Sequence, residues 1–205
     1  ALQAADATAG THTITLTSTT YNLILGEITI GNTTQNITIN GIDSASTIIN
    51  MTTTNQDRIL FIDPSGTQPG VVTSINNLKF TGGHLISDLY GGGAIQAGGP
   101  TNVLNLTKCV FDRNTVDPAS GTLGGAISMT GGGALNINQC YFRNNKNPVS
   151  DGGAIYYFLQ NDVNLTGSMV ITNSIFWKDT VIAPGANVEA IGFSGPGASA
   201  GNTFS

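Results

Sequence analysis

The side chains best suited to chemistry form one small set of opposite charges, Asp112, Arg113, Arg143 and Asp151. Cleavage of a polysaccharide requires paired carboxylates, or a base with Arg or Lys and often Ca²⁺, converging on one face. Asp112 and Arg143 are explained more simply as neutralising each other at the surface, where such a pair is worth under ~1 kcal/mol. We therefore predict an Asp112–Arg143 surface pair and assign no catalytic residue.

Two cysteines, Cys109 and Cys140, stand at equivalent positions of neighbouring repeats. On adjacent strands their Cα atoms would lie ~4.8 Å apart, which a disulfide permits, but side chains pointing the same way in a parallel ladder are poorly oriented for bonding. We expect two buried free thiols, with a disulfide and an oxidising compartment as the alternative. His12 and His84 fall outside this column, so neither a metal nor a cofactor is expected. Calcium at the Asp-bearing loops lacks the nonapeptide signature that would support it.

A repeated template must position these side chains. It reads apolar-x-apolar, two polar residues, then apolar-x-aromatic, and four copies end at residues spaced 31, 31 and 34 apart: Phe80, Phe111, Phe142 and Phe176. Strict alternation indicates a strand with one buried face, and the two inserted polar residues indicate a bend. A chain that repeats this pattern winds instead of folding back on itself. A degenerate earlier copy, Ile37 to Ile42, lacks the aromatic residue.

A second motif, Gly-Gly-Ala-Ile, begins at Gly92, Gly124 and Gly152 and supplies a third short strand per turn. The sequence therefore predicts an all-β, right-handed, single-stranded parallel β-helix, a pectate-lyase-like solenoid of about five coils. We expect a single domain over residues 1–205, with an N-terminal cap and first coil in 1–35 and repeating coils in 36–205. A short helix is expected at Ala1–Asp6, and the chain is expected to belong to a longer polypeptide.

Stacking the repeats in register predicts columns of equivalent residues. The aromatic residues of the template should form an internal stack. A neighbouring inward column holds Leu78, Cys109, Cys140 and Ser174. A polar ladder at the bend holds Asn76, Thr107, Asn138 and Thr172, beside Asn77, Lys108, Gln139 and Asn173. The outward column directly after each Phe of the template holds Thr81, Asp112, Arg143 and Trp177, so Arg143 is also expected against Trp177.

Composition restricts the partners. Charged residues make up 9% of the chain, against roughly 25% in an ordinary domain. The net charge of −5, with seven Lys and Arg spread along the sequence, argues against nucleic acid. No apolar run approaches the ~20 residues of a membrane helix. A neutral surface rich in Thr and Asn is typical of bacterial or archaeal proteins that are secreted or held at the cell surface, and we expect an extracellular location.

The pairing of Gly-Gly-Ala-Ile with Phe-x-x-Asn, at Phe111–Asn114 and Phe142–Asn145, resembles the repeat pair of chlamydial polymorphic outer-membrane proteins. The opening of the chain, from Ala1 through Thr13–Leu16 and Glu27–Ile30 to Ile37–Gly41, looks like the start of large bacterial surface β-helix proteins. The resemblance implies an exported β-helical passenger that serves in adhesion or surface assembly. Two copies, Phe80–Gly83 and Phe176–Asp179, depart from Phe-x-x-Asn.

These observations favour a noncatalytic extracellular adhesin or structural surface protein. Its expected partners are copies of itself, stacked head-to-tail into filaments or laterally, or a glycan or protein of a host or cell surface. A polysaccharide lyase or glycoside hydrolase on the same fold is the alternative. Ice binding would require outward Thr rows that repeat at the coil period, and the Thr-x-Thr series at Thr11–Thr17 does not repeat.

Overall fold

The computed structural model describes residues 10–31, 35–52, 56–62, 70–86, 91–117, 123–148, 152–159, 167–182 and 190–194. These residues form strands and turns, with no helix among them. No helix capable of crossing a membrane occurs in this part of the chain. The helix expected at Ala1–Asp6 lies outside the described residues.

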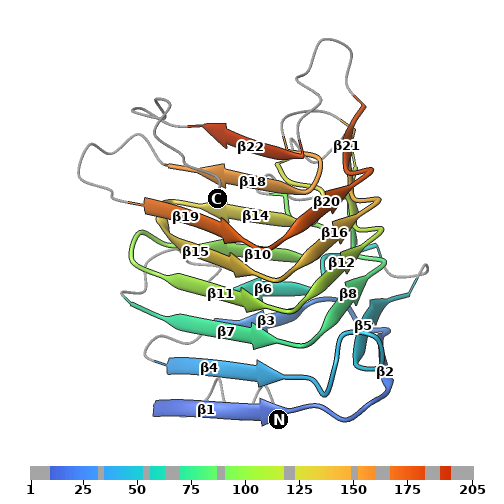
Figure 1. Cartoon of the computed structure of the whole chain (residues 1–205), viewed down its shortest axis with the longest axis vertical. Helices are drawn as coiled ribbons and strands as arrows, with labels where there is room; N and C mark the ends of the chain where they lie inside the picture. Colours follow the sequence, from blue (N-terminus) through green and yellow to red (C-terminus); the bar gives the residue numbers. More distant parts are fainter. Residues whose placement is uncertain are drawn as a thin grey trace.

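The strands stack into four parallel sheets (Figure 1). The first sheet contains β1 (Gly10–Thr15), β4 (Gln35–Asn40), β7 (Val72–Asn76), β11 (Val103–Thr107), β15 (Gly133–Asn138) and β19 (Gly167–Thr172). The second contains β2 (Thr20–Leu23), β5 (Ile48–Met51), β8 (Lys79–Thr81), β12 (Val110–Asp112), β16 (Tyr141–Arg143) and β20 (Ile175–Trp177). The third contains β3 (Ile28–Ile30), β6 (Leu60–Ile62), β10 (Ile95–Gly98), β14 (Ile127–Thr130), β18 (Ile155–Phe158) and β22 (Ile191–Ser194). A short sheet contains β9 (His84–Leu85), β13 (Thr115–Val116), β17 (Lys146–Asn147) and β21 (Thr180–Val181).

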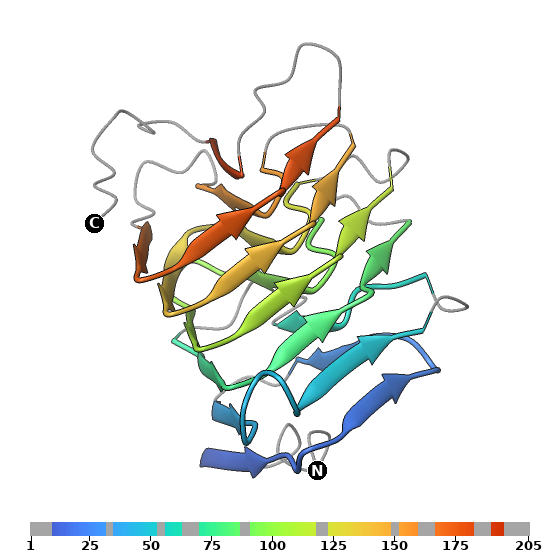
Figure 2. The ribbon, with the colours of Figure 1, turned by 45° about the vertical axis from the view of Figure 1, so that its right-hand side comes forward.

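From β7 onward, each coil passes through the first, second, short and third sheets in that order; the two earlier coils pass from the second sheet to the third. In Figure 1 the first sheet runs left to right in front and the third returns behind it while the chain rises, so the winding is right-handed. Figure 2 shows the second sheet from its own side, with parallel strands rising from blue to red. The expected right-handed parallel β-helix is confirmed.

The number of coils and of strands per coil differs from the expectation. Four complete coils, beginning at β7, β11, β15 and β19, contain all four strands, and two N-terminal coils precede them with no short strand among their described residues. Each strand of the short sheet has only two residues. A two-residue strand is too short for alternation to reveal, so the sequence predicted three strands per coil instead of four; the expected number of coils was about five.

The core is built from equivalent residues of successive coils. Phe80, Phe111, Phe142 and Phe176 are paired in register, and their rings stack with centroids 5.2, 4.8 and 4.7 Å apart and interplanar angles of 6–9°. Beside them lie Leu78, Cys109, Cys140 and Ser174. Both cysteines are buried and free, and the Cys109 thiol donates to the Ile75 carbonyl (3.4 Å). In-register parallel pairing thus turns a sequence repeat into continuous columns.

The polar pair inside the template forms the bend between the first and second sheets. Its second residue adopts a left-handed conformation in each of the four complete coils, with φ of 51–58° at Asn77, Lys108, Gln139 and Asn173. Its first residue carries the polar ladder: the Asn76 amide donates to Asn40 Oδ1 (2.9 Å), and the Thr172 hydroxyl lies 3.0 Å from Asn138 Oδ1. These bonds satisfy polar groups at the corner and connect neighbouring coils.

Candidate functional site

A second bend, between the second and short sheets, brings the polar residues of the chain together. After each stacked ring, one residue points outward, the next adopts a left-handed conformation, and the third returns to the interior. The left-handed positions are Gly82, Arg113, Asn144 and Lys178, with φ of 73, 57, 56 and 55°. The Phe-x-x-Asn motif is therefore one turn of this bend, with its ring in the aromatic stack and its amide inside the coil.

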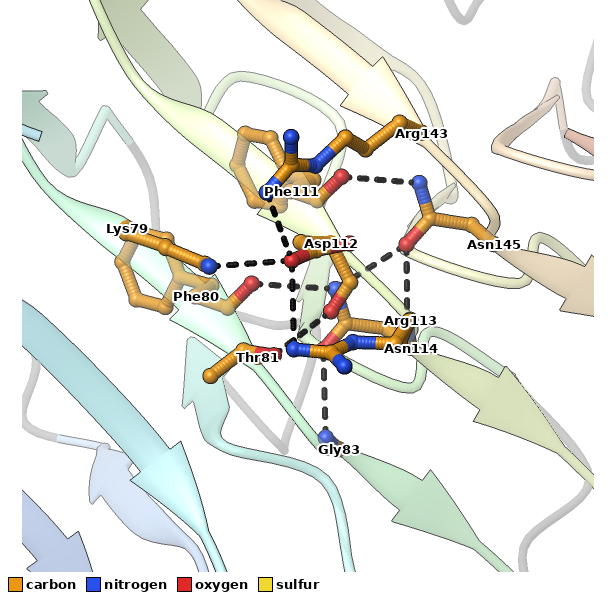
Figure 3. Close-up of polar contacts among 10 residues, drawn as sticks. All are labelled: Lys79, Phe80, Thr81, Gly83, Phe111, Asp112, Arg113, Asn114, Arg143 and Asn145. Carbon is orange, nitrogen blue, oxygen red and sulfur yellow. Dashed lines mark hydrogen bonds and ion pairs between the residues drawn. The ribbon is translucent and has the colours of Figure 1, made fainter. Parts of the chain in front are cut away.

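The inward amides form a ladder along the interior (Figure 3). Asn114 donates from Nδ2 to the Phe80 carbonyl (3.2 Å) and to Asn145 Oδ1 (3.0 Å). Asn145 donates in the same way to the Phe111 carbonyl (3.0 Å) and to Asp179 Oδ1 (2.8 Å). Both amides are fully buried, so these bonds satisfy groups that would otherwise be costly to remove from water.

The two departures from Phe-x-x-Asn are the ends of this ladder. Gly83 occupies the lower end, where a Cβ would lie 1.9 Å from the Gly93 carbonyl oxygen, so no Asn fits. Its backbone N–H donates to Asn114 Oδ1 (3.1 Å). Asp179 occupies the upper end and accepts from Asn145, but its Oδ2 is buried without a hydrogen-bond partner among the described residues. Burial raises the pKa of Asp179 to about 6, although the bonds from Asn145 oppose the shift.

On the outward side of the same bend, Asp112 lies under three cations. Its Oδ2 is 2.9 Å from Lys79 Nζ, 3.0 Å from Arg143 and 3.4 Å from Arg113 (Figure 3). These side chains cover the carboxylate, which is only 2% exposed although it points away from the core. Burial alone would raise the pKa of Asp112, but hydrogen bonds from Arg143 and Lys79 and the nearby positive charges outweigh it and lower that pKa.

The same region concentrates the positive charge of the chain. Five of its seven Lys and Arg residues lie on the second sheet, the short sheet or the bend between them: Lys79, Arg113, Arg143, Lys146 and Lys178. The other two are Lys108, at the first bend, and Arg58, which is buried with its Nε 2.7 Å from Glu27. Cations that are spread along the sequence are therefore gathered by the winding of the chain.

An open cleft of about 690 Å³ lies at this bend, lined by Arg113, Asn114, Thr115, Asn144 and Lys146. All five side chains are polar, and two are cationic. Thr115 and Lys146 are paired in register on the short sheet. Arg113 and Lys146 are both exposed, so their charges are accessible to a ligand. The cleft is suited to hold an anionic, hydrogen-bonding group.

The structure contains the predicted pair of Asp112 and Arg143. Asp112 and Arg143 are paired in register and joined by the 3.0 Å contact. Arg143 and Trp177 are paired in register on adjacent strands, but the Arg143 guanidinium lies over the Tyr141 ring (5.7 Å), and the cation over the Trp177 ring is Lys178 (5.8 Å). Asp151, the fourth member of the candidate cluster, lies outside the described residues.

Sequence reasoning missed that Lys79 and Arg113 also bind Asp112. The information was present in the alignment of repeats, because Lys79 stands two residues before Thr81 and so faces the same side of its strand. In the described residues, no three His, Cys, Asp or Glu side chains gather where a metal ion could bind. No protein-family model matches the chain, and neither the curated proteins nor the solved structures contain a match.

Proposed function

We propose that this chain is a noncatalytic section of an extracellular adhesin or structural surface protein. The observation that carries the proposal is that the best candidate acid, Asp112, is buried and bound through one oxygen by Lys79, Arg143 and Arg113. A carboxylate held ionised under three cations is unsuited to donate a proton and is shielded from a substrate. Its role is to bind neighbouring coils together.

The interior supports the same role. The aromatic stack and the amide ladder both run parallel to the axis, so each coil is bonded to the next at several points. Such a section is suited to hold other parts of a surface protein at a fixed distance. Because Phe-x-x-Asn supplies one ring and one ladder amide per coil, the motif serves architecture. We also propose that the chain is related to the polymorphic outer-membrane proteins, and this proposal rests on Phe-x-x-Asn and Gly-Gly-Ala-Ile.

A glycan screen tests the noncatalytic role against a lyase or hydrolase. Purified protein is incubated with polygalacturonate, alginate, xylan and dextran, with and without Ca²⁺, and products are followed by ultraviolet absorbance and reducing-end assay. We expect no product above the level of heat-inactivated protein. Release of oligosaccharides that Asp112→Asn abolishes would overturn the proposal and establish the enzyme in its place.

The last coil supports a further part of the proposal, head-to-tail assembly of copies. Val170, Ile175 and Trp177 are 51, 61 and 55% exposed on the outward face of β19 and β20, where the coil below carries Asn136, Tyr141 and Arg143. Among the described strands, β19 and β1 are the two edges of the first sheet. Unpaired parallel edges can be extended by a further strand, so the first coil of one copy could continue the last coil of another.

Electron microscopy and light scattering test this assembly. We expect the wild-type chain to form short rows of stacked particles at high concentration. Val170→Asn with Ile175→Lys, which uses residues found at equivalent positions of lower coils, should shift the population to monomers. Wild-type protein that stays monomeric at every concentration would contradict assembly, and the noncatalytic role would be unaffected.

A further inference from the structure

The positive cleft suggests which kind of partner the surface takes. The chain carries a net charge of −5, yet five of its seven cations lie around this one bend. Asp112 contacts three of these cations, Lys79, Arg113 and Arg143, through Oδ2; it neutralises part of their charge and is buried. The exposed part of the region, Arg113, Lys146 and Lys178, remains positive on an otherwise acidic chain. A local field of this sign attracts anions and disfavours neutral or cationic partners.

Asp112 also fixes the position of the cations. Arg113 and Arg143 are held from successive coils by the same carboxylate oxygen, at 3.4 and 3.0 Å. The backbone of Arg113 is also fixed. It is left-handed, and its N–H donates to the Arg143 carbonyl (3.1 Å). A guanidinium that is already oriented loses less conformational entropy when a ligand binds. The edge of the cleft is therefore preorganised before any partner arrives.

The lining of the cleft indicates the chemistry of the partner. Between Arg113 and Lys146 lie the Asn144 amide and the Thr115 hydroxyl, whereas the Asn114 amide is buried behind them and already hydrogen-bonded. Amides and hydroxyls match sugar hydroxyl groups, and the two cations match a carboxylate or sulfate. Among the described residues, no aromatic side chain lines the cleft, so they offer no platform for stacking a nucleobase. Nucleic-acid binding depends on neutralising many phosphates, and the net charge of −5 opposes it.

We propose that this cleft binds the acidic groups of an anionic polysaccharide, carboxylates or sulfates carried on sugar rings. The inference rests on the proposed function and deepens it by naming the chemistry of the partner. Successive coils present their cations at the ~4.8 Å strand spacing, so an extended polymer lying along the axis can meet Arg113, Lys146 and Lys178 in turn. A weak, multivalent interaction of this kind suits an adhesive surface.

Binding is measured with four probes: polygalacturonate, which carries carboxylates, dextran sulfate, which carries sulfates, uncharged dextran, and a single-stranded oligonucleotide. The test variant combines Arg113→Asn with Lys146→Thr, because Asn144 and Thr115 occupy the same positions of adjacent coils. The matched control is Lys108→Gln, since Gln139 occupies that position in the next coil. Circular dichroism and thermal unfolding verify that each variant is folded.

We expect wild type and Lys108→Gln to bind at least one acidic polysaccharide, weakened by salt, and to ignore dextran. The double variant should bind about tenfold more weakly, because two exposed charge contacts are lost. The two acidic probes distinguish a carboxylate from a sulfate ligand. No binding to either one, equal binding by the double variant, or tighter binding to the oligonucleotide would each overturn the proposal. If a polysaccharide is bound and also cleaved, the cleft proposal stands and the noncatalytic function fails.

Discussion

At the residue scale, Asp112 and Asp179 show how the same side chain takes opposite properties from its surroundings. Asp112 is buried and Asp179 is partly buried, and removal from water by itself raises the pKa of a carboxyl group. Three cations surround Asp112 and lower its pKa, whereas Asp179 has amide donors and no cation within hydrogen-bond distance among the described residues. Asp112 therefore stabilises the fold as an anion, and Asp179 is best accommodated as a neutral acid.

Replacing Asp112 by Asn should destabilise the protein by about 2–3 kcal/mol at pH 7, because Lys79 and Arg143 lose their counter-ion. The folded-state pKa is lowered below 3.8, so the contribution of Asp112 is present above pH 4 and is lost as the pH falls below it. Urea denaturation at pH 7 and pH 3 measures both effects. Arg113→Asn, which removes only the longest contact from an exposed side chain, is the control and should cost under about 1 kcal/mol. Equal effects of the two variants would contradict this account.

Replacing Asp179 by Asn should stabilise the protein at neutral pH, whereas the Asp112 replacement destabilises it. The pKa of Asp179 is raised to about 6, so its stabilising contribution is full below pH 4 and is lost as the pH rises through 6. The substituted amide would keep the acceptor for Asn145 and add a donor like that of Asn114, so we expect a gain on the order of 1 kcal/mol at pH 7.5 and none at pH 4. Thermal unfolding at the two pH values measures the difference. Asp179→Ala, which removes the acceptor, should destabilise at both.

At the element scale, the stacked strands explain why one template carries most of the stability. Each copy supplies a strand of the first sheet, a bend and a strand of the second sheet, and in-register pairing repeats every inward contact in the next coil. The middle rings are packed on both sides by neighbouring rings, whereas Phe176 has a ring only below it among the described residues. The energetic importance of a residue therefore depends on the position of its coil in the stack.

Phe111→Ala and Phe176→Ala make this dependence measurable. Phe111 is fully buried between two rings, so its truncation should cost about 3–5 kcal/mol through lost burial and a cavity. Phe176 is only partly buried, and its truncation should cost less than half as much. Denaturant unfolding compares the two variants. A larger loss at Phe176 would show that the last coil is covered in solution by another surface.

At the scale of the whole molecule, stability should vary along the axis. A solenoid is stabilised by nearest-neighbour contacts between coils, so the central coils have two neighbours and the outer described coils have one. The amides of β11, β12, β15 and β16 should exchange with solvent more slowly than those of β1, β2, β19 and β20. Hydrogen exchange read by mass spectrometry checks this gradient. Slow exchange in β19 and β20 at high protein concentration alone would indicate stacking of copies.

The winding also creates the charge distribution. Lys79, Arg113 and Lys146 are far apart in sequence. Each is a cation at a position where the adjacent coil above or below carries an uncharged residue. Only the register of the coils places all three near one bend and brings Arg113 and Lys146 to one cleft. The proposed polysaccharide site is therefore a property of the assembled coils, and no one repeat contains it.

The sequence by itself determined the β-helix, its template and the inward columns. Alternation with a two-residue insertion reports burial directly, and a fixed repeat length fixes which residues stack, as the Phe column illustrates. The tertiary structure alone decided the short sheet, the ladder from Asn114 to Asp179 and the three cations on Asp112. These depend on where the chain turns and how far side chains reach between coils. Residues that are distant along the chain meet only when the backbone has closed a full turn.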